Sequence, residues 1–174
     1  MSENKRCSNL ETAVEGRNLV MERTFDAPKE LVFKAFSESD QLASWWGPQG
    51  WQTENRTFEF EPDGVWHYCM RCVDEGQGDF YGQESWGKAV YQEIEAPNKI
   101  VYNDVFADEK GNAVEGMPKI QANYIFQDQD GQTKLIVRNQ FASVETLEAI
   151  MDMGIVQGFS SQMDKLDDHL KRVQ

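Results

Sequence analysis

The sequence predicts an α+β fold in which a curved antiparallel sheet of about seven strands wraps around one long C-terminal helix. Three observations support this prediction. Two short helical patterns follow the first strand pattern, six further segments with strand character are separated by turn signals, and residues 143–174 form a helical pattern without proline. A sheet followed by one long amphipathic helix is typical of layered α+β domains, because each element must bury its apolar face.

The first strand and the two short helices are expected near the N-terminus. Residues 17–25 place apolar side chains on one face of a strand. Pro28 fits the first turn of a helix, where its missing N–H group removes no hydrogen bond. Ser37 and Ser39 can each cap a second, shorter helix, which ends with two adjacent tryptophans before residues 47–48 (Gly-Pro). The chain is therefore expected to turn a corner directly after the tryptophans.

Six further strands are expected in the middle of the chain. Residues 62–64 (Pro-Asp-Gly) and 130–131 (Asp-Gly) have the composition of hairpin turns, because Pro fixes φ and Gly accepts a positive φ. Gly82 and Gly87 lie within a strand pattern and indicate a bulge or bend, which a curved sheet needs. The expected strands cover residues 52–61, 65–72, 80–95, 98–107, 119–127 and 133–142.

The last segment is expected to be the longest helix of the chain. Ser143 is a good N-cap, and Glu145 lies in the first turn, where a negative charge is favourable. Gly154 and Gly158 lie on or beside the apolar stripe, although a glycine inside a helix costs about 1 kcal/mol relative to alanine. Either the sheet backbone packs very closely there, or space is left empty. The stripe consists of Leu147, Ile150, Met151, Ile155, Phe159, Met163, Leu166 and Leu170.

Composition and length indicate one acidic, globular domain. The chain has 174 residues, 40% of them hydrophobic, and a net charge of −13. We expect residues 1–15 to be a mobile tail and residues 16–174 to form a single domain. No apolar run approaches the roughly 18 residues of a membrane span, and the N-terminus lacks the apolar core of a secretory signal, which predicts a cytoplasmic protein. The negative charge argues against nucleic acid as a partner, because it repels phosphates.

Few residues suggest catalysis or metal binding. The two histidines, His67 and His169, lack the neighbours of a catalytic triad and are interpreted as surface or satisfied side chains. Cys69 and Cys72 are three residues apart in a strand and so point to opposite faces, which does not suit a zinc or redox pair. The third cysteine, Cys7, lies in the expected tail. We therefore expect no metal and no cofactor.

Several segments together resemble a known protein family. Residues 25–51, FDAPKELVFKAFSESDQLASWWGPQGW, combine an Ala-Pro-x-Glu helix start with a Trp-Trp corner. Over roughly residues 17–172 the chain resembles the START-like SRPBCC superfamily, and within it the branch named for the C-terminal domain of the activator of heat-shock-protein-90 ATPase. The resemblance implies a helix-grip fold in a bacterial-type single domain. The later matching segments are Gly64-x-Trp66, WGKAVYQEIEAPNKIVY, DEKGN, GQTKL and a final helix with Gly154, Gly158 and Phe159.

The resemblance also implies a ligand cavity, because START-like domains commonly enclose an apolar pocket between the long helix and the concave sheet. Asn139 and Tyr124 are the expected polar anchors, and Phe159 stands where the family often has tryptophan. Glu54 and Arg56 could add a polar anchor at the mouth of the pocket, or simply lie at an exposed strand end. Each candidate could instead be ordinary core. The candidate ligand-binding residues are Trp66, Tyr68, Met70, Tyr124, Phe126, Val137, Asn139, Met151, Gly154, Ile155, Gly158 and Phe159.

Three functions are compatible with the sequence. The leading hypothesis is non-catalytic binding of a small, largely apolar molecule in the helix-grip cavity. An enzyme of the polyketide cyclase or hydrolase kind found elsewhere in the superfamily is the first alternative. The second alternative is a chaperone-partner or stress-related role like that of the namesake domain, with a protein partner or a homodimer.

Overall fold

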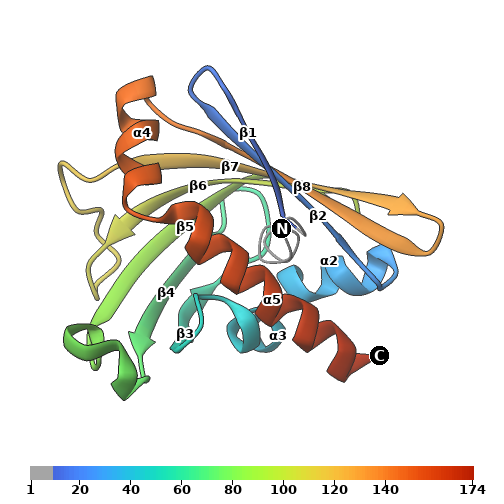
Figure 1. The fold of residues 1–174 in the computed structure, drawn as a ribbon, viewed down its shortest axis with the longest axis horizontal. Coiled ribbons are helices and arrows are strands. Elements are labelled where there is room, and N and C mark those ends of the chain that lie inside the picture. Colours follow the sequence, from blue (N-terminus) through green and yellow to red (C-terminus); the bar gives the residue numbers. More distant parts are fainter. Residues whose placement is uncertain (1–9) are drawn as a thin grey trace, which may run out of the picture.

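The computed structural model describes residues 10–174, which form one antiparallel sheet with helices packed on one face (Figure 1). The strands are β1 (Glu11–Glu15), β2 (Asn18–Phe25), β3 (Trp51–Phe58), β4 (Val65–Cys72), β5 (Glu84–Glu95), β6 (Lys99–Ala107), β7 (Lys119–Gln129) and β8 (Gln132–Gln140). The helices are α2 (Lys29–Ser37), α3 (Ser39–Trp45), the 3₁₀ helix η1 (Glu75–Phe80), α4 (Val144–Asp152) and α5 (Ile155–Val173).

The topology confirms the helix-grip α+β fold. The eight strands lie in the order β1-β2-β8-β7-β6-β5-β4-β3, and neighbouring strands are antiparallel. Pairing of β2 with β8 places the second strand of the chain beside the last one. Helices α2, α3 and α5 lie on the same side of the sheet, where they cover its apolar face (Figure 1). The core of the domain is therefore the layer between the sheet and these helices.

One strand lies where we expected a mobile tail. Residues 11–15 form β1, which pairs with β2 from Glu11 opposite Glu22 to Glu15 opposite Asn18. Gly16, with φ of 62°, permits the two-residue turn between these strands. The side chains of β1 are exposed, so backbone hydrogen bonds to the edge of β2 hold this strand. The sheet has eight strands for this reason, and residues 1–9, with Cys7, lie outside the described residues.

The expected single C-terminal helix is divided into α4 and α5, so that prediction is wrong in this respect. Gly154 lies between them with φ of 92°, a left-handed conformation that glycine adopts without a steric penalty. Its N–H group donates to the carbonyl of Met151 at 3.0 Å, which closes the end of α4. Gly158 remains inside a helix, in the first turns of α5. The two glycines therefore have different structural roles.

The helix caps follow the sequence only in part. Ser143 caps α4 as expected, because its Oγ accepts from the N–H group of Thr146 at 3.1 Å. The expected serine caps of α3 are wrong: its N-cap residue is Glu38, whose side chain makes no capping hydrogen bond. Ser37 instead ends α2, and its Oγ lies 3.4 Å from the carbonyl oxygen of Lys34.

Hydrogen bonds connect the corner after the tryptophans, residues 47–51, to α5. The N–H group of Gly47, at a φ of 97°, donates to Oε1 of Gln162 at 2.8 Å. One helical turn further on, Lys165 donates to the carbonyl oxygen of Trp51 at 3.0 Å. The indole of Trp45 donates to the carbonyl oxygen of Ala35 at 3.0 Å and so fixes α3 against α2. This corner is consequently positioned by both the short helices and the long one.

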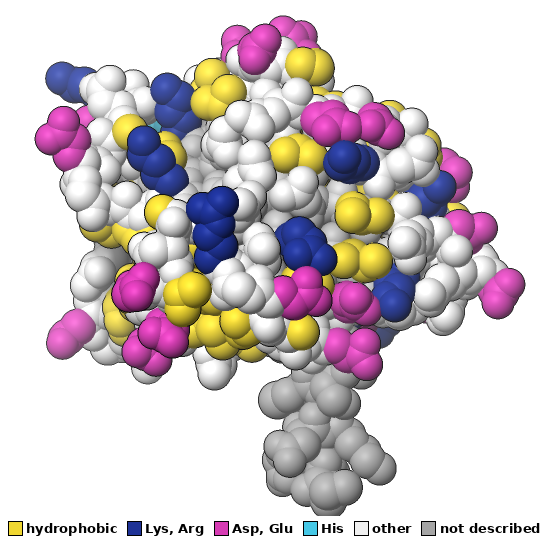
Figure 2. Space-filling model, turned by 90° about the horizontal axis from the view of Figure 1, so that it is seen from above, with side chains coloured by type: hydrophobic (Ala, Val, Ile, Leu, Met, Phe, Trp, Pro, Cys, Tyr) yellow, Lys and Arg dark blue, Asp and Glu magenta, His cyan; other side chains and the backbone are white. Residues whose placement is uncertain are grey.

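The surface carries charges of both signs. On the face shown in Figure 2, Lys and Arg side chains lie among Asp and Glu side chains rather than apart from them. Ion pairs between strands include Lys134 of β8 with Glu22 of the neighbouring β2 at 3.0 Å, and Arg138 of β8 with Glu15 of β1 at 3.1 Å. Within residues 10–174, none of the helices combines the length and the apolar composition needed to cross a membrane.

Candidate functional site

A cavity of about 260 Å³ lies between the inner face of the sheet and α5. Strands β4, β6, β7 and β8 form its floor, and the corner before β3 and the first half of α5 close it from the other side. Ile155 and Phe159 of α5 are partly exposed, so the cavity opens to solvent beside this helix. The lining residues are Trp46, Pro48, Tyr68, Met70, Tyr102, Asp104, Phe106, Ile120, Ala122, Tyr124, Asn139, Ile155, Gly158, Phe159 and Gln162.

Aromatic rings form much of the cavity wall. Trp46 and Tyr68 meet edge to face with ring centroids 6.0 Å apart, and Tyr102 and Tyr124 are stacked with centroids 5.6 Å apart. The hydroxyl of Tyr102 donates to the hydroxyl oxygen of Tyr124 at 3.0 Å. Alternation along β6 and β7 places these rings on the face that the helices cover. The wall is therefore apolar with a few fixed hydroxyl groups.

Asp104 is the one carboxyl group among the described residues that line the cavity. The hydroxyl of Tyr68 donates to its two oxygens, with distances of 3.2 Å and 3.3 Å. Burial raises the pKa of Asp104 to about 7, although the hydrogen bond from Tyr68 stabilises the charged form. Burial and the nearby Asp104 also raise the pKa of Tyr68 well above its usual value, so this phenol remains a donor. The pair can accept and donate hydrogen bonds inside an apolar space.

Gly87 explains how Tyr68 reaches Asp104 across an intervening strand. In the sheet register, Gly87 of β5 lies opposite Tyr68 of β4. A β-carbon built on Gly87 would overlap the tip of the Tyr68 ring, so the phenol lies directly on the glycine backbone. The irregularity in the pairing of β5 occurs elsewhere, between Tyr91 and Glu93. The prediction of a bulge or bend at Gly87 is therefore wrong. The glycine instead permits close contact between the Tyr68 ring and the backbone of β5.

The structure brings seven of the twelve predicted ligand-binding residues to this cavity. They are Tyr68, Met70, Tyr124, Asn139, Ile155, Gly158 and Phe159. The other five lie elsewhere, so their direct roles in the cavity are not supported: Trp66, Phe126 and Val137 are fully buried in the core, Met151 packs against the core from α4, and Gly154 forms the junction of α4 and α5.

Sequence reasoning missed the polar end of the cavity. Tyr102, Asp104 and Phe106 lie two residues apart along β6 and therefore point to the same face. This spacing was visible in the sequence, and a carboxyl group between two aromatic residues on one strand face was the available signal. Gln162 was also missed, because its position beside the cavity depends on where α5 crosses the sheet.

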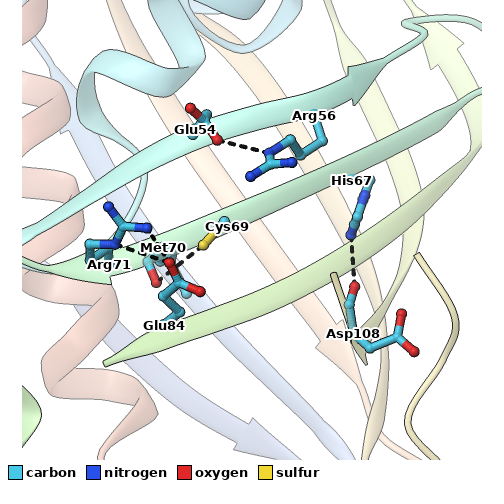
Figure 3. A network of polar contacts seen from close by, with 8 residues as sticks. All are labelled: Glu54, Arg56, His67, Cys69, Met70, Arg71, Glu84 and Asp108. Atoms are coloured by element: carbon cyan, nitrogen blue, oxygen red, sulfur yellow. Dashed lines mark hydrogen bonds and ion pairs between the residues drawn. The ribbon is translucent and has the colours of Figure 1, made fainter. Parts of the chain in front are cut away.

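Glu54 and Arg56 do not belong to the cavity. They lie on β3 and pair with each other, with Nε of Arg56 at 2.8 Å from Oε1 of Glu54 (Figure 3). Together with Arg71 they line a separate pocket at the edge of the sheet. Nε2 of His67 lies 2.9 Å from the carbonyl oxygen of Asp108 on the outer face of β4 (Figure 3). His67 is thus a satisfied side chain, as interpreted from the sequence.

The cysteines and acidic residues form no metal centre within residues 10–174. Cys69 and Cys72 are both buried, free thiols. Burial raises the pKa of the Cys69 thiol, which lowers its reactivity. No group of three or more His, Cys, Asp or Glu side chains in this part of the chain could hold a metal ion.

Comparisons with known proteins agree with this architecture. A solution structure of a protein from Arthrobacter aurescens is 26% identical, with a TM-score of 0.83 over 94% of this chain and 91% of that chain. A protein from Staphylococcus epidermidis gives 24% identity and a TM-score of 0.80 over 94% of each chain. A crystal structure of a Mycobacterium smegmatis protein gives 24% identity and a TM-score of 0.79 over 91% of this chain and 93% of that chain.

The family assignment comes from a family model rather than from a single relative. No curated protein sequence matches the chain. The model described as "Activator of Hsp90 ATPase homolog 1-like protein" matches residues 26–171. This range includes both short helices, the six strands from β3 to β8, α4 and most of α5. The chain therefore belongs to the family of Activator of Hsp90 ATPase homolog 1-like proteins.

Proposed function

We propose that this protein binds a small, largely apolar molecule in the cavity between the sheet and α5. The observation that carries the proposal is the cavity itself, about 260 Å³ of space lined mainly by aromatic and aliphatic side chains at the centre of the fold. Ligand sites are usually concave, mostly apolar and supplied with a few convergent polar groups. Asp104, Tyr124 and Asn139 are such groups here.

Gly158 supports the proposal that the space is kept open. A β-carbon at this position would meet no atom within 4 Å, so the glycine is not required by close packing against the sheet. Alanine at an interior helix position would be more stable by about 1 kcal/mol. The absence of a side chain at this lining position leaves room for an occupant in the cavity.

The test compares a filled cavity with an open one. N-phenyl-1-naphthylamine, an uncharged fluorescent probe, is titrated into the parent protein, Gly158→Leu and the matched control Gly158→Ala. We expect the parent and the alanine variant to bind the probe, and the leucine variant to stay folded but lose most binding, because its side chain occupies the cavity. Near-UV circular dichroism checks the fold of each variant.

Two results would contradict the proposal. The parent protein would show no saturable binding of the probe, or the leucine variant would bind as well as the parent while keeping native dichroism. In the second case the probe would bind elsewhere on the surface.

A further inference from the structure

The cavity contains a carboxyl group without a positively charged neighbour in its lining. Asp104 lies in the middle of β6, opposite Ala89 of β5 and Ile120 of β7. Its carboxyl group accepts hydrogen bonds from the hydroxyl of Tyr68 and from the backbone of Val105, which are both uncharged donors. No Lys or Arg among residues 10–174 lines the cavity. Asp104 is half-buried, and a carboxylate withdrawn from water is costly without a positively charged partner, so this arrangement suits a cation that arrives with the ligand.

The rings around Asp104 favour the same kind of partner. The cavity lining includes Trp46 and three tyrosines, Tyr68, Tyr102 and Tyr124. The face of an aromatic ring attracts cations, and ammonium groups are recognised in proteins by cages of several aromatic rings. The stacking of Tyr102 on Tyr124 leaves their ring faces roughly parallel, with an angle of 24° between the planes. Both the charge and the rings therefore suit a cation.

The geometry points to a ligand with a protonated amine on an apolar body, whose ammonium group is held by Asp104 and the surrounding aromatic rings. This inference rests on the proposed function and names the chemical class of its ligand. An anionic ligand would bring a second negative charge beside Asp104, in a chain of net charge −13. An uncharged apolar ligand would leave the carboxyl group without a positively charged partner in the cavity.

The pH dependence of binding follows from the groups that face Asp104. Tyr68 of β4, Tyr102 of β6 and Tyr124 of β7 are the other titratable groups in the described lining. Burial raises the pKa of all three, so they stay protonated near neutral pH. Helix α5 and the corner before β3 contribute side chains that do not titrate: Trp46, Pro48, Ile155, Gly158, Phe159 and Gln162. Amine binding should therefore strengthen as Asp104 ionises.

The experiment uses three probes that share one apolar body and differ in charge. Isothermal titration calorimetry measures 2-phenylethylamine, 2-phenylethanol and phenylacetate with the parent protein at about pH 8, where the carboxyl group is ionised. We expect the amine to bind about tenfold more tightly than the alcohol, and phenylacetate to bind most weakly. Lowering the pH to about 6 should remove most of the preference for the amine.

Substitutions assign the preference to this site. Asp104→Asn should bring the amine to the affinity of the alcohol and leave the alcohol unchanged. Asp168→Asn removes one negative charge from an exposed position on α5 and should leave the preference intact. Tyr68→Phe removes the side-chain hydrogen bond that lowers the pKa of Asp104, and the backbone hydrogen bond from Val105 remains. This variant should keep the preference but require a higher pH to reach it, and it provides a test should Asp104→Asn fail to fold.

The outcomes separate this inference from the proposed function. Equal affinity of the amine and the alcohol at about pH 8, or an amine preference that survives in Asp104→Asn, would overturn the amine class while cavity binding stands. Binding of the uncharged naphthyl probe with no binding of the amine would overturn it as well. If neither the naphthyl probe nor any phenyl probe binds, the proposed function falls and this inference falls with it.

Discussion

The Nη1 atom of Arg23 lies 2.8 Å from Oδ1 of Asp164, and this ion pair joins strand β2 to helix α5. The side chain of Arg23 is only 8% exposed, whereas that of Asp164 is 60% exposed. Asp167 adds a second carboxylate at 3.8 Å from Nη2 of the same guanidinium. A positive charge on the inner face of the sheet is thus neutralised by the helix that covers it.

Removing Asp164 should therefore weaken the attachment of α5. We expect Asp164→Ala to lower the free energy of unfolding by about 1–2 kcal/mol, because a largely buried guanidinium loses its nearer partner. Asp168→Ala, on an exposed position of the same helix, should change it by less than about 0.5 kcal/mol. Urea unfolding measures both. Equal effects of the two substitutions would show that the ion pair contributes nothing specific.

The two glycines near the start of α5 should respond to alanine with opposite signs. Gly154 has φ of 92°, a conformation that costs an L-residue roughly 1–2 kcal/mol, so Gly154→Ala should be destabilised. Gly158 is helical with open space at its β-carbon, so Gly158→Ala should gain up to about 1 kcal/mol. Thermal unfolding of the two variants against the parent checks both signs. Destabilisation of Gly158→Ala would indicate that the cavity wall is tighter there than the geometry implies.

Deletion of the C-terminal helices should abolish cooperative unfolding. Met163, Leu166 and Leu170 of α5 are almost fully buried against the sheet, and the apolar face loses this cover when residues 143–174 are removed. A chain that lacks only residues 173–174 serves as the control and should unfold cooperatively. The measurement is differential scanning calorimetry together with near-UV circular dichroism. A sharp transition in the shorter chain would mean that the sheet folds without its helix.

Asp104 should make the protein less stable as the pH rises. Its pKa is about 7 in the folded state, above the value of about 4 expected for an unfolded chain. Between these values the folded state binds more protons, so the free energy of unfolding decreases as pH increases and the group ionises. Asp104→Asn lacks this contribution.

The difference between Asp104→Asn and the parent isolates the effect from other titrating groups. We compare the free energy of unfolding of the variant with that of the parent at about pH 4.5 and at about pH 7.5. The difference, variant minus parent, should increase by roughly 2–4 kcal/mol from the lower pH to the higher. Urea unfolding at both pH values gives the two differences. A constant difference across this range would contradict a raised pKa at Asp104.

Alternation and turn chemistry predicted seven of the eight strands of the sheet, all except the edge strand β1. Residues 119–127 and 133–142 alternate cleanly and form β7 and β8, joined at Asp130 and Gly131 as expected. The break in the last helix could not be derived in the same way. Gly154 is compatible with both a helical and a left-handed backbone, and the apolar stripe continues at helical spacing on both sides of it. Its conformation is decided by tertiary packing.

The cavity was predicted less completely than the fold, because alternation gives the face of a residue but not its depth. Trp66 and Tyr68 share one face of β4, yet Trp66 is enclosed by the core and Tyr68 borders the cavity. Which of them meets open space depends on where α5 crosses the sheet and where Gly158 lies. Asp104 was a different case: its face could be read from Tyr102 and Phe106, but its hydrogen bond depends on the contact of Tyr68 with Gly87.

The position of β2 beside β8 also affects how the chain reaches its native state. The register pairs Asn18 with Gln140 and Phe25 with Thr133, residues more than a hundred positions apart. Contacts of such sequence separation carry a high loop-closure cost and slow the folding of a domain. During synthesis β2 must wait for nearly the whole domain before its partner is available, with Leu19 and Met21 exposed until then. We therefore expect this pairing to form late, after the local hairpins β3–β4 and β7–β8.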